Sequence, residues 1–309
     1  MGLTGEEEAV NELSVALWAT NVGPRLNGLD AWISRIDAKM TEAKAKGADL
    51  LVIPEYASVQ WLSFAPEGIA LDREIAWMAS QAPDALGALR PLVARHDMAL
   101  LAGSMPVGAD GAYVNRAHLF LPDGQEHIQD KLCLTPQEQN PQGWNLQVGG
   151  TLNVISWRGL RLAIAICLDI ELPALAARLA PLALDVILVP SMTEALSGYH
   201  RVFDCAKARA VETQSILCPV GTIGDTGYRD PVESNVSGAA VYGPCEESLG
   251  STGVLGSLPP QGHDEGDGPM LVVKDLPIAE VRAMRKGGAY VWPGAWSGEH
   301  VIVNDPQGQ

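Results

Sequence analysis

The segment RLAIAICLDIELPAL, from Arg161 to Leu175, holds a continuous apolar run that ends at Cys167. The run predicts a strand over 160–167, and the acidic residues and proline that follow predict a helix over 172–180. Cys167 then has two readings. It is either a buried cysteine that packs as a small hydrophobe, or a thiol held at the end of a strand, where sites of α/β proteins gather.

The rest of the chain repeats this alternation of short apolar runs with longer segments of helical periodicity. Strands are predicted at 13–19, 49–55, 98–107, 112–122, 152–157, 160–167, 185–191, 215–221, 236–242 and 270–274, and helices at 28–48, 68–96, 172–180, 200–213 and 277–285. The alternation predicts an α/β fold with helices covering the faces of the sheets. The hairpin-like pairs at 98–122 and 152–167 favour mixed sheets.

No linker rich in Gly, Ser and Pro interrupts the first 225 residues, so we expect one domain over 1–309 with its core at about 12–285. The segment PPQGHDEGDGP, residues 259–269, is expected to be an exposed loop.

Composition excludes several classes of partner. The net charge of −16 disfavours both a nucleic-acid backbone and an anionic membrane surface. No secretory signal is recognisable, and the longest apolar runs, about eight residues, fall short of the roughly 20 that span a bilayer. The five cysteines are scattered without a CxxC pair, which favours a cytoplasmic protein with reduced thiols and without a zinc site.

Three predicted strand ends carry reactive side chains. Glu55 follows the apolar run of LLVIPEY, Lys131 and Glu138 lie in EHIQDKLCLTPQE after a hairpin, and Cys167 ends LAIAIC. A thiol, an ammonium and two carboxylates form a chemically complete set for acyl transfer.

In these segments, and over nearly the whole chain, the sequence resembles the nitrilase superfamily of carbon–nitrogen hydrolases, in its amidase-like branch. GADLLVIPEY resembles the first glutamate segment of that family, YVNRAHLFLPDGQEHIQDKLCLTPQE its hairpin and lysine loop, and AIAICLDIELPALAARLA its nucleophile segment. AKARAVETQSILCPVGTIG resembles a further segment, which contains Arg209 and Glu212. The four segments occur in the order of the family.

The resemblance implies a catalytic role for each reactive residue. Cys167 is the expected nucleophile, Glu55 its general base, and Lys131 the positive charge beside the oxyanion. Glu138 is expected to orient Lys131, although it also suits a helix cap. The backbone N–H of Leu168 is a further expected oxyanion donor. No metal or organic cofactor is implied.

Other polar residues near these segments have structural interpretations. We expect Asp169 to cap the next helix, with orientation of the site as the alternative. Arg209 and Glu212 are expected to form a structural or interface ion pair. The remaining cysteines are expected to pack. Residues that follow strand ends or the lysine loop are candidates for substrate binding, namely Tyr56, Trp144, Leu168, Met192, Thr193 and, as a further pocket-lining candidate, Glu194.

The residues after the nucleophile bear on the substrate. Cys-x-Asp is similar to amidase-like members of the family, whereas true nitrilases tend to have Cys-Trp-Glu, so a small amide is the expected substrate, with water as the second reactant. Leu168 departs from the more usual Tyr of the family. A nitrile or an N-carbamoyl amino acid is the alternative substrate, and Arg201 and Arg229 are candidates to bind a substrate carboxylate. An inactive scaffold on the same fold is the non-enzymatic alternative.

The resemblance also implies a four-layer α-β-β-α sandwich with two mixed sheets. It further implies a homodimer or higher homo-oligomer, with the helices near 172–180 and 200–213 as the expected contact. The C-terminal extension 286–309 is expected to dock on a partner subunit.

Overall fold

The computed structural model describes residues 12–229, 232–290 and 299–303 of the chain. Its strands form two six-stranded sheets, ordered β12-β1-β2-β3-β4-β5 and β11-β10-β9-β8-β7-β6. The strands of the first sheet are β1 (Val15–Trp18), β2 (Leu50–Val52), β3 (Ala99–Ala109), β4 (Ala112–Phe120), β5 (Glu126–Asp130) and β12 (Met270–Val273). Those of the second are β6 (Ile155–Trp157), β7 (Leu160–Ile164), β8 (Val186–Ser191), β9 (Ile216–Gly221), β10 (Ser237–Tyr242) and β11 (Val254–Gln261).

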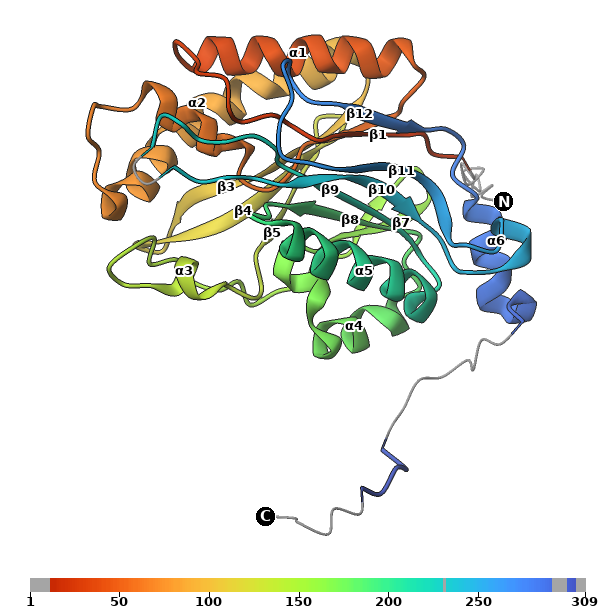
Figure 1. The fold of residues 1–309 in the computed structure, drawn as a ribbon. Helices are drawn as coiled ribbons and strands as arrows, with labels where there is room; N and C mark the ends of the chain where they lie inside the picture. The colour runs from red at the N-terminus through yellow and green to blue at the C-terminus, as the bar shows by residue number, and fades with distance from the viewer. Residues whose placement is uncertain (1–11, 230–231, 291–298, 304–309) are drawn as a thin grey trace, which may run out of the picture.

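Helices cover the outer face of each sheet, so the molecule has four layers in the order α-β-β-α (Figure 1). The α-helices are α1 (Leu29–Ala45), α2 (Leu71–His96), α3 (Pro136–Gln139), α4 (Pro173–Leu179), α5 (Leu196–Thr213) and α6 (Ile278–Ala283). The helices α1 and α2 lie on the first sheet, and α4 and α5 lie on the second (Figure 1). The predicted sandwich of two mixed sheets is confirmed.

The two-residue period of the strands assigns their side chains to the two faces of the first sheet. In β1, Val15 and Leu17 join the apolar core shared with the second sheet, whereas Ala16 and Trp18 pack with the core beneath α1 and α2. Both faces are buried, because another layer covers each of them. This is why the inner strands are apolar at nearly every position.

The parallel strands bring three chain segments to one edge of the sandwich. β2 runs parallel to β1 and β3, and β7, β8 and β9 run parallel to one another. Their carboxyl ends lead to Glu55, Cys167 and Met192. Glu55 extends the first sheet through an isolated bridge to Ser104.

Two strands were not predicted. β5 has the polar sequence EHIQD at the edge of its sheet, and therefore lacks the apolar run by which a buried strand is recognised. β11 contains two prolines, which a strand tolerates at a sheet edge where one row of N–H groups is unpaired. The loop predicted at 259–269 is wrong for residues 259–261, which belong to β11.

The structure does not test two predictions, the docking of the C-terminal extension and the single-domain organisation. The expected docking of the extension 286–309 involves residues 291–298 and 304–309, which lie outside the described residues. The single-domain organisation over 1–309 stays a prediction. Among the helices of the described ranges, none has the length and apolar character needed to cross a membrane.

Candidate active site

Cys167 lies three residues beyond β7, where the strand turns into a short 3-10 helix, Cys167–Glu171. Its backbone has φ of +49°, in the left-handed region that non-glycine residues seldom adopt. The side chain is 6% exposed, and its Sγ donates to the carbonyl oxygen of Met192 at 3.5 Å. Such backbone strain at a turn is frequent at functional sites. The thiol therefore projects from a tight turn rather than from within the strand.

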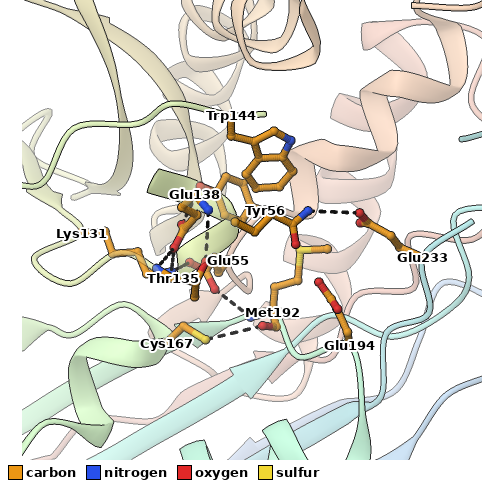
Figure 2. A pocket seen from close by; sticks show the side chains of 11 residues that line it. Glu55, Tyr56, Lys131, Thr135, Glu138, Trp144, Cys167, Met192, Glu194 and Glu233 are labelled. Atoms are coloured by element: carbon orange, nitrogen blue, oxygen red, sulfur yellow. Dashed lines mark hydrogen bonds and ion pairs between the residues drawn. The ribbon is translucent and has the colours of Figure 1, made fainter. Parts of the chain in front are cut away.

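Lys131 lies between two carboxylates in the interior, where it is 2% exposed. Its Nζ donates to Oε1 of Glu55 at 2.8 Å and to Oε2 of Glu138 at 2.7 Å. An ammonium has three N–H donors, so one remains for a further acceptor. Figure 2 shows these side chains around one cavity with Cys167.

Further donors hold the two carboxylates in place. Nδ2 of Asn115 donates to Oε1 of Glu55 at 2.9 Å and reaches Oε1 of Glu138 at 3.3 Å, while Tyr56 donates its hydroxyl to Glu138 at 2.9 Å. The backbone N–H of Met192 donates to Oε2 of Glu55 at 2.9 Å (Figure 2). Met192 thus contacts both the carboxylate, through its N–H, and the thiol, through its carbonyl.

Burial and charge set the protonation of this cluster. Burial raises the pKa of Glu55, an effect that the charge of Lys131 opposes. Burial acts in the same direction on Glu138, but Lys131 outweighs it and holds the pKa of Glu138 below its usual value. Burial would lower the pKa of Lys131, yet the two carboxylates raise it above the ordinary range. The ammonium is therefore charged at neutral pH.

The thiol of Cys167 is neutral in this arrangement. Burial, followed by the nearby charge of Glu55, raises its pKa well above the usual value, and the charge of Lys131 and the hydrogen bond to Met192 oppose the rise only in part. A nucleophile of this kind needs a base that removes its proton during the reaction. Glu55, which contacts both Lys131 and the segment at Met192, is the carboxylate beside it.

Glu138 fits both of its sequence interpretations. It is the third residue of a capping box with Thr135, whose hydroxyl accepts from the N–H of Glu138 at 3.3 Å and whose N–H donates to Oε2 at 2.8 Å. The same Oε2 accepts from Lys131. The helix cap therefore fixes the carboxylate that binds the ammonium.

The cavity beside Cys167 has a volume of about 70 Å³. Of the residues expected to bind substrate, Tyr56, Trp144 and Met192 line this cavity, and so does the further candidate Glu194. Gln137 and Glu233 also line it and were not predicted. Leu168 and Thr193 are not among its lining residues. The hydroxyl of Thr193 donates to the carbonyl of Val236 at 2.7 Å.

The structure contradicts the expectation that Asp169 caps the next helix. The helix α4 begins after Leu172 without a side-chain cap, so Asp169 is not its cap. Its carboxylate instead accepts from the backbone N–H groups of Ile166, Leu132 and Cys133. Burial raises its pKa to about 7, against the effect of these hydrogen bonds and of Lys131.

The arginines near the site are all engaged by carboxylates. The predicted pair of Arg209 and Glu212 is confirmed at 2.9 Å. Arg229 is buried between Glu74 and Glu233, and the exposed Arg201 binds Glu171. Neither Arg201 nor Arg229 lines the cavity.

The sequence marks Asn115 only as part of the family's hairpin, and sequence reasoning assigned no role to Asn115 or to the backbone of Met192. A polar residue inside the apolar strand β4 was the available signal for Asn115, because a buried amide requires hydrogen-bond partners. The backbone groups of Met192 leave no trace in the sequence. Within the described residues, no group of three or more His, Cys, Asp or Glu side chains is placed to hold a metal ion.

Comparison with known proteins adds to this geometry. The family model described as carbon–nitrogen hydrolase matches residues 15–257. The probable hydrolase YhcX of Bacillus subtilis is 27% identical over 267 residues, which are 85% of this chain and 50% of that protein. An (R)-stereoselective amidase of Pseudomonas sp. is 30% identical over 182 residues, 58% of this chain and 61% of that protein. The chain thus spans about half to three fifths of the length of these relatives.

Among solved structures, an amidase from Nesterenkonia sp. is similar, with a TM-score of 0.66 and 25% identity. The similarity covers 88% of this chain and 94% of that one.

Proposed function

The chain belongs to the carbon–nitrogen hydrolase family, and on this premise we propose that it hydrolyses a small amide through a thioester on Cys167. One observation carries the proposal: the thiol of Cys167, the ammonium of Lys131 and the carboxylates of Glu55 and Glu138 line one cavity. The ion pairs of 2.7 and 2.8 Å orient the ammonium before any substrate binds. Such prior orientation is what makes electrostatic catalysis effective.

In the proposed acylation, Glu55 removes the proton of the thiol while the sulfur attacks the amide carbon. Negative charge then develops on the carbonyl oxygen. The third N–H of Lys131 and the backbone N–H of Leu168 are the proposed donors to this oxygen. Leu168 lies in the first turn of its short helix, where N–H groups lack an intrahelical acceptor. Each such donor commonly lowers the barrier by about 2.7–4 kcal/mol.

The tetrahedral intermediate collapses when its C–N bond breaks, and the leaving nitrogen takes the proton from Glu55. Ammonia or an amine departs, and a thioester remains on Cys167. Water then enters, gives a proton to Glu55 and attacks the thioester carbon. The C–S bond breaks, the sulfur recovers the proton, and a carboxylic acid is released. Glu55 thus serves as base and acid in turn.

The charges around the cavity bear on the acyl group. Glu194 and Glu233 line the cavity in addition to Glu55 and Glu138. Burial and, less strongly, the charge of Glu233 raise the pKa of Glu194, and the charge of Arg229 opposes the rise. Because Arg229 is already bound by Glu74 and Glu233, it has no free charge for a substrate carboxylate. We therefore propose a small uncharged amide rather than an N-carbamoyl amino acid.

Ammonia release from a matched panel tests the proposal. The panel contains a short aliphatic amide, the corresponding nitrile, the same amide with a terminal carboxylate, and an N-carbamoyl amino acid. We expect turnover of the neutral amide by the wild-type protein and none by Cys167→Ala. Cys218→Ala is the control, since Cys218 is a buried cysteine of β9 outside the cavity. Preference for the nitrile or a carboxylate-bearing substrate would refute the amide assignment.

A further inference from the structure

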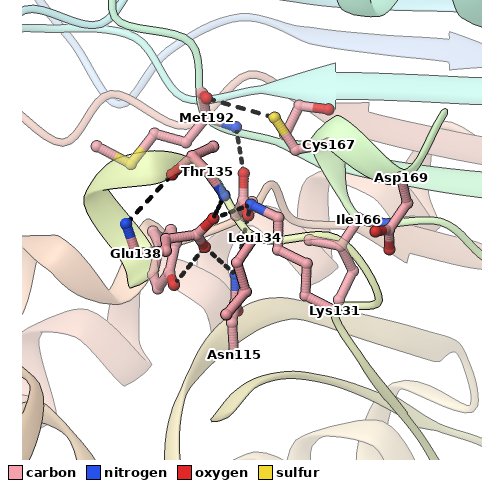
Figure 3. Close-up of polar contacts among 12 residues, drawn as sticks. Asn115, Lys131, Leu134, Thr135, Glu138, Ile166, Cys167, Asp169 and Met192 are labelled. Carbon is pink, nitrogen blue, oxygen red and sulfur yellow. Dashed lines mark hydrogen bonds and ion pairs between the residues drawn. The ribbon is translucent and has the colours of Figure 1, made fainter. Parts of the chain in front are cut away.

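Asp169 connects the two chain segments that carry the nucleophile and the lysine. Its Oδ1 accepts from the N–H of Cys133 at 2.8 Å and of Leu132 at 3.1 Å, just after Lys131. Its Oδ2 accepts from the N–H of Ile166 at 3.0 Å, just before Cys167. The carboxylate is 1% exposed and lies between the two segments (Figure 3).

The same residue closes the turn around the nucleophile. The N–H of Asp169 donates to the carbonyl of Ile166 at 3.0 Å, while its carboxylate accepts from the N–H of Ile166. This reciprocal pair encloses Cys167, whose left-handed backbone would otherwise relax toward a more common conformation. Asp169 therefore stabilises the turn that presents the thiol.

Groups other than Asp169 fix the side chain and the backbone N–H of Lys131. Its Nζ is held by Glu55 and Glu138, and its backbone N–H donates to the carbonyl of Asn115 at 2.9 Å. All of these contacts come from the first sheet and the loop that follows it. The link from this loop to the turn of Cys167 is made by the carboxylate of Asp169.

We propose that Asp169 is a positioning residue for the reaction, because its carboxylate sets the distance between the turn of Cys167 and the loop of Lys131. The proposal rests on the proposed function. Both oxygens of the carboxylate act as acceptors, so an amide at this position would direct an NH₂ group at a backbone N–H. One of the two segments would then lose its link, and a misplacement of about 1 Å commonly costs on the order of 100-fold in rate.

The test compares Asp169→Asn with Asp185→Asn. Asp185 is equally buried, and it accepts from the N–H of Arg161 at 2.9 Å and from Arg282. It lies just before β8, at the opposite end of that strand from Met192. Both variants lose a buried carboxylate, but only one of these carboxylates bridges the catalytic segments.

We expect Asp169→Asn to lower kcat by about 10- to 100-fold with KM nearly unchanged, and Asp185→Asn to lower the unfolding midpoint while kcat is kept. A second readout is independent of turnover, namely the alkylation rate of Cys167 by iodoacetamide, resolved by peptide mass spectrometry. Because the charge of Lys131 lowers the pKa of the thiol, its displacement in Asp169→Asn should slow alkylation.

Unchanged kcat and an unchanged alkylation rate in Asp169→Asn would overturn the proposal. It would also be overturned if kcat fell in Asp185→Asn as well, with each variant's loss of kcat matching its loss of stability. If wild-type protein is alkylated at Cys167 but hydrolyses no amide, the proposed function fails, and the alkylation comparison alone decides the role of Asp169. If Asp169→Asn does not fold, Asp169→Glu replaces it. This side chain is one methylene longer and should also displace the loop, so a wild-type kcat or, without turnover, a wild-type alkylation rate would overturn the proposal.

Discussion

Replacing Lys131 by Met tests the electrostatic core of the site. The substitution removes the ammonium that bonds to Glu55 at 2.8 Å and to Glu138 at 2.7 Å, while both carboxylates stay buried. Asn115, Tyr56 and the N–H of Met192 still donate to them, but none of these groups carries a positive charge. Two neighbouring carboxylates are then left without a counter-charge in the interior.

The expected loss follows from the geometry. Removal of one partner from a buried ion pair costs about 3–5 kcal/mol. The folded variant can reduce this cost by binding a proton, so the pKa of one carboxylate should rise. A rise of one unit corresponds to about 1.4 kcal/mol, so the full cost is equivalent to a rise of about two to four units. The folded state then binds more protons than the unfolded one, and its stability must fall as pH increases.

The assay is urea unfolding followed by tryptophan fluorescence at about pH 8 and about pH 5. We expect Lys131→Met to be less stable than wild type by about 3–5 kcal/mol at the higher pH and to recover most of the difference at the lower one. The double variant Lys131→Met/Glu138→Gln, which has one carboxylate fewer, should regain part of the loss at the higher pH. A variant as stable as wild type, or a loss that does not depend on pH, would refute the reasoning.

Three further results are expected. Glu55→Gln should fold but show no turnover of the amide, because the base is absent; circular dichroism and ammonia release check this, and a turnover near that of wild type would contradict it. Tyr56→Phe should lower the free energy of unfolding by about 1–2 kcal/mol, since Glu138 loses a buried donor; urea unfolding measures it, with no loss as the contrary outcome. Finally, kcat/KM should fall on acidification with a midpoint above the ordinary glutamate pKa of about 4.3. The reason is that burial raises the pKa of Glu55 and that only its ionised form accepts a proton. A midpoint at or below that value would contradict the assignment of Glu55 as the base.

Sequence reasoning located Glu55 and Cys167 because each follows an apolar run, whereas Lys131 and Glu138 follow the polar strand β5 and were located by the family resemblance of their loop. Glu55 comes after β2 and Cys167 after β7, and parallel strands bring their carboxyl ends to one edge of the sheets. The edge strands β5 and β11 escaped detection, since a polar or proline-containing edge strand lacks that apolar signal.

The sequence did not reveal which backbone groups bind side chains far away in the chain. Asp169 binds N–H groups 36 and 37 residues away, and every residue except proline has such a group, so no residue type marks the partner. The cap of α4 expected of Asp169 was reasonable on local grounds but wrong, because its carboxylate accepts instead from the N–H of Ile166, at the start of the short 3-10 helix, and from the distant N–H groups of Leu132 and Cys133. The same limit applies to Met192, which acts on Glu55 and Cys167 through its backbone.

Intact-protein and peptide mass spectrometry of samples quenched during turnover of the neutral amide would examine the thioester itself. We predict one added acyl group per chain, carried by the peptide that contains Cys167 and removed by hydroxylamine. Cys167→Ala should show neither the adduct nor ammonia release. An acyl group on another residue, or continued hydrolysis by Cys167→Ala, would contradict the assignment of Cys167 as the nucleophile.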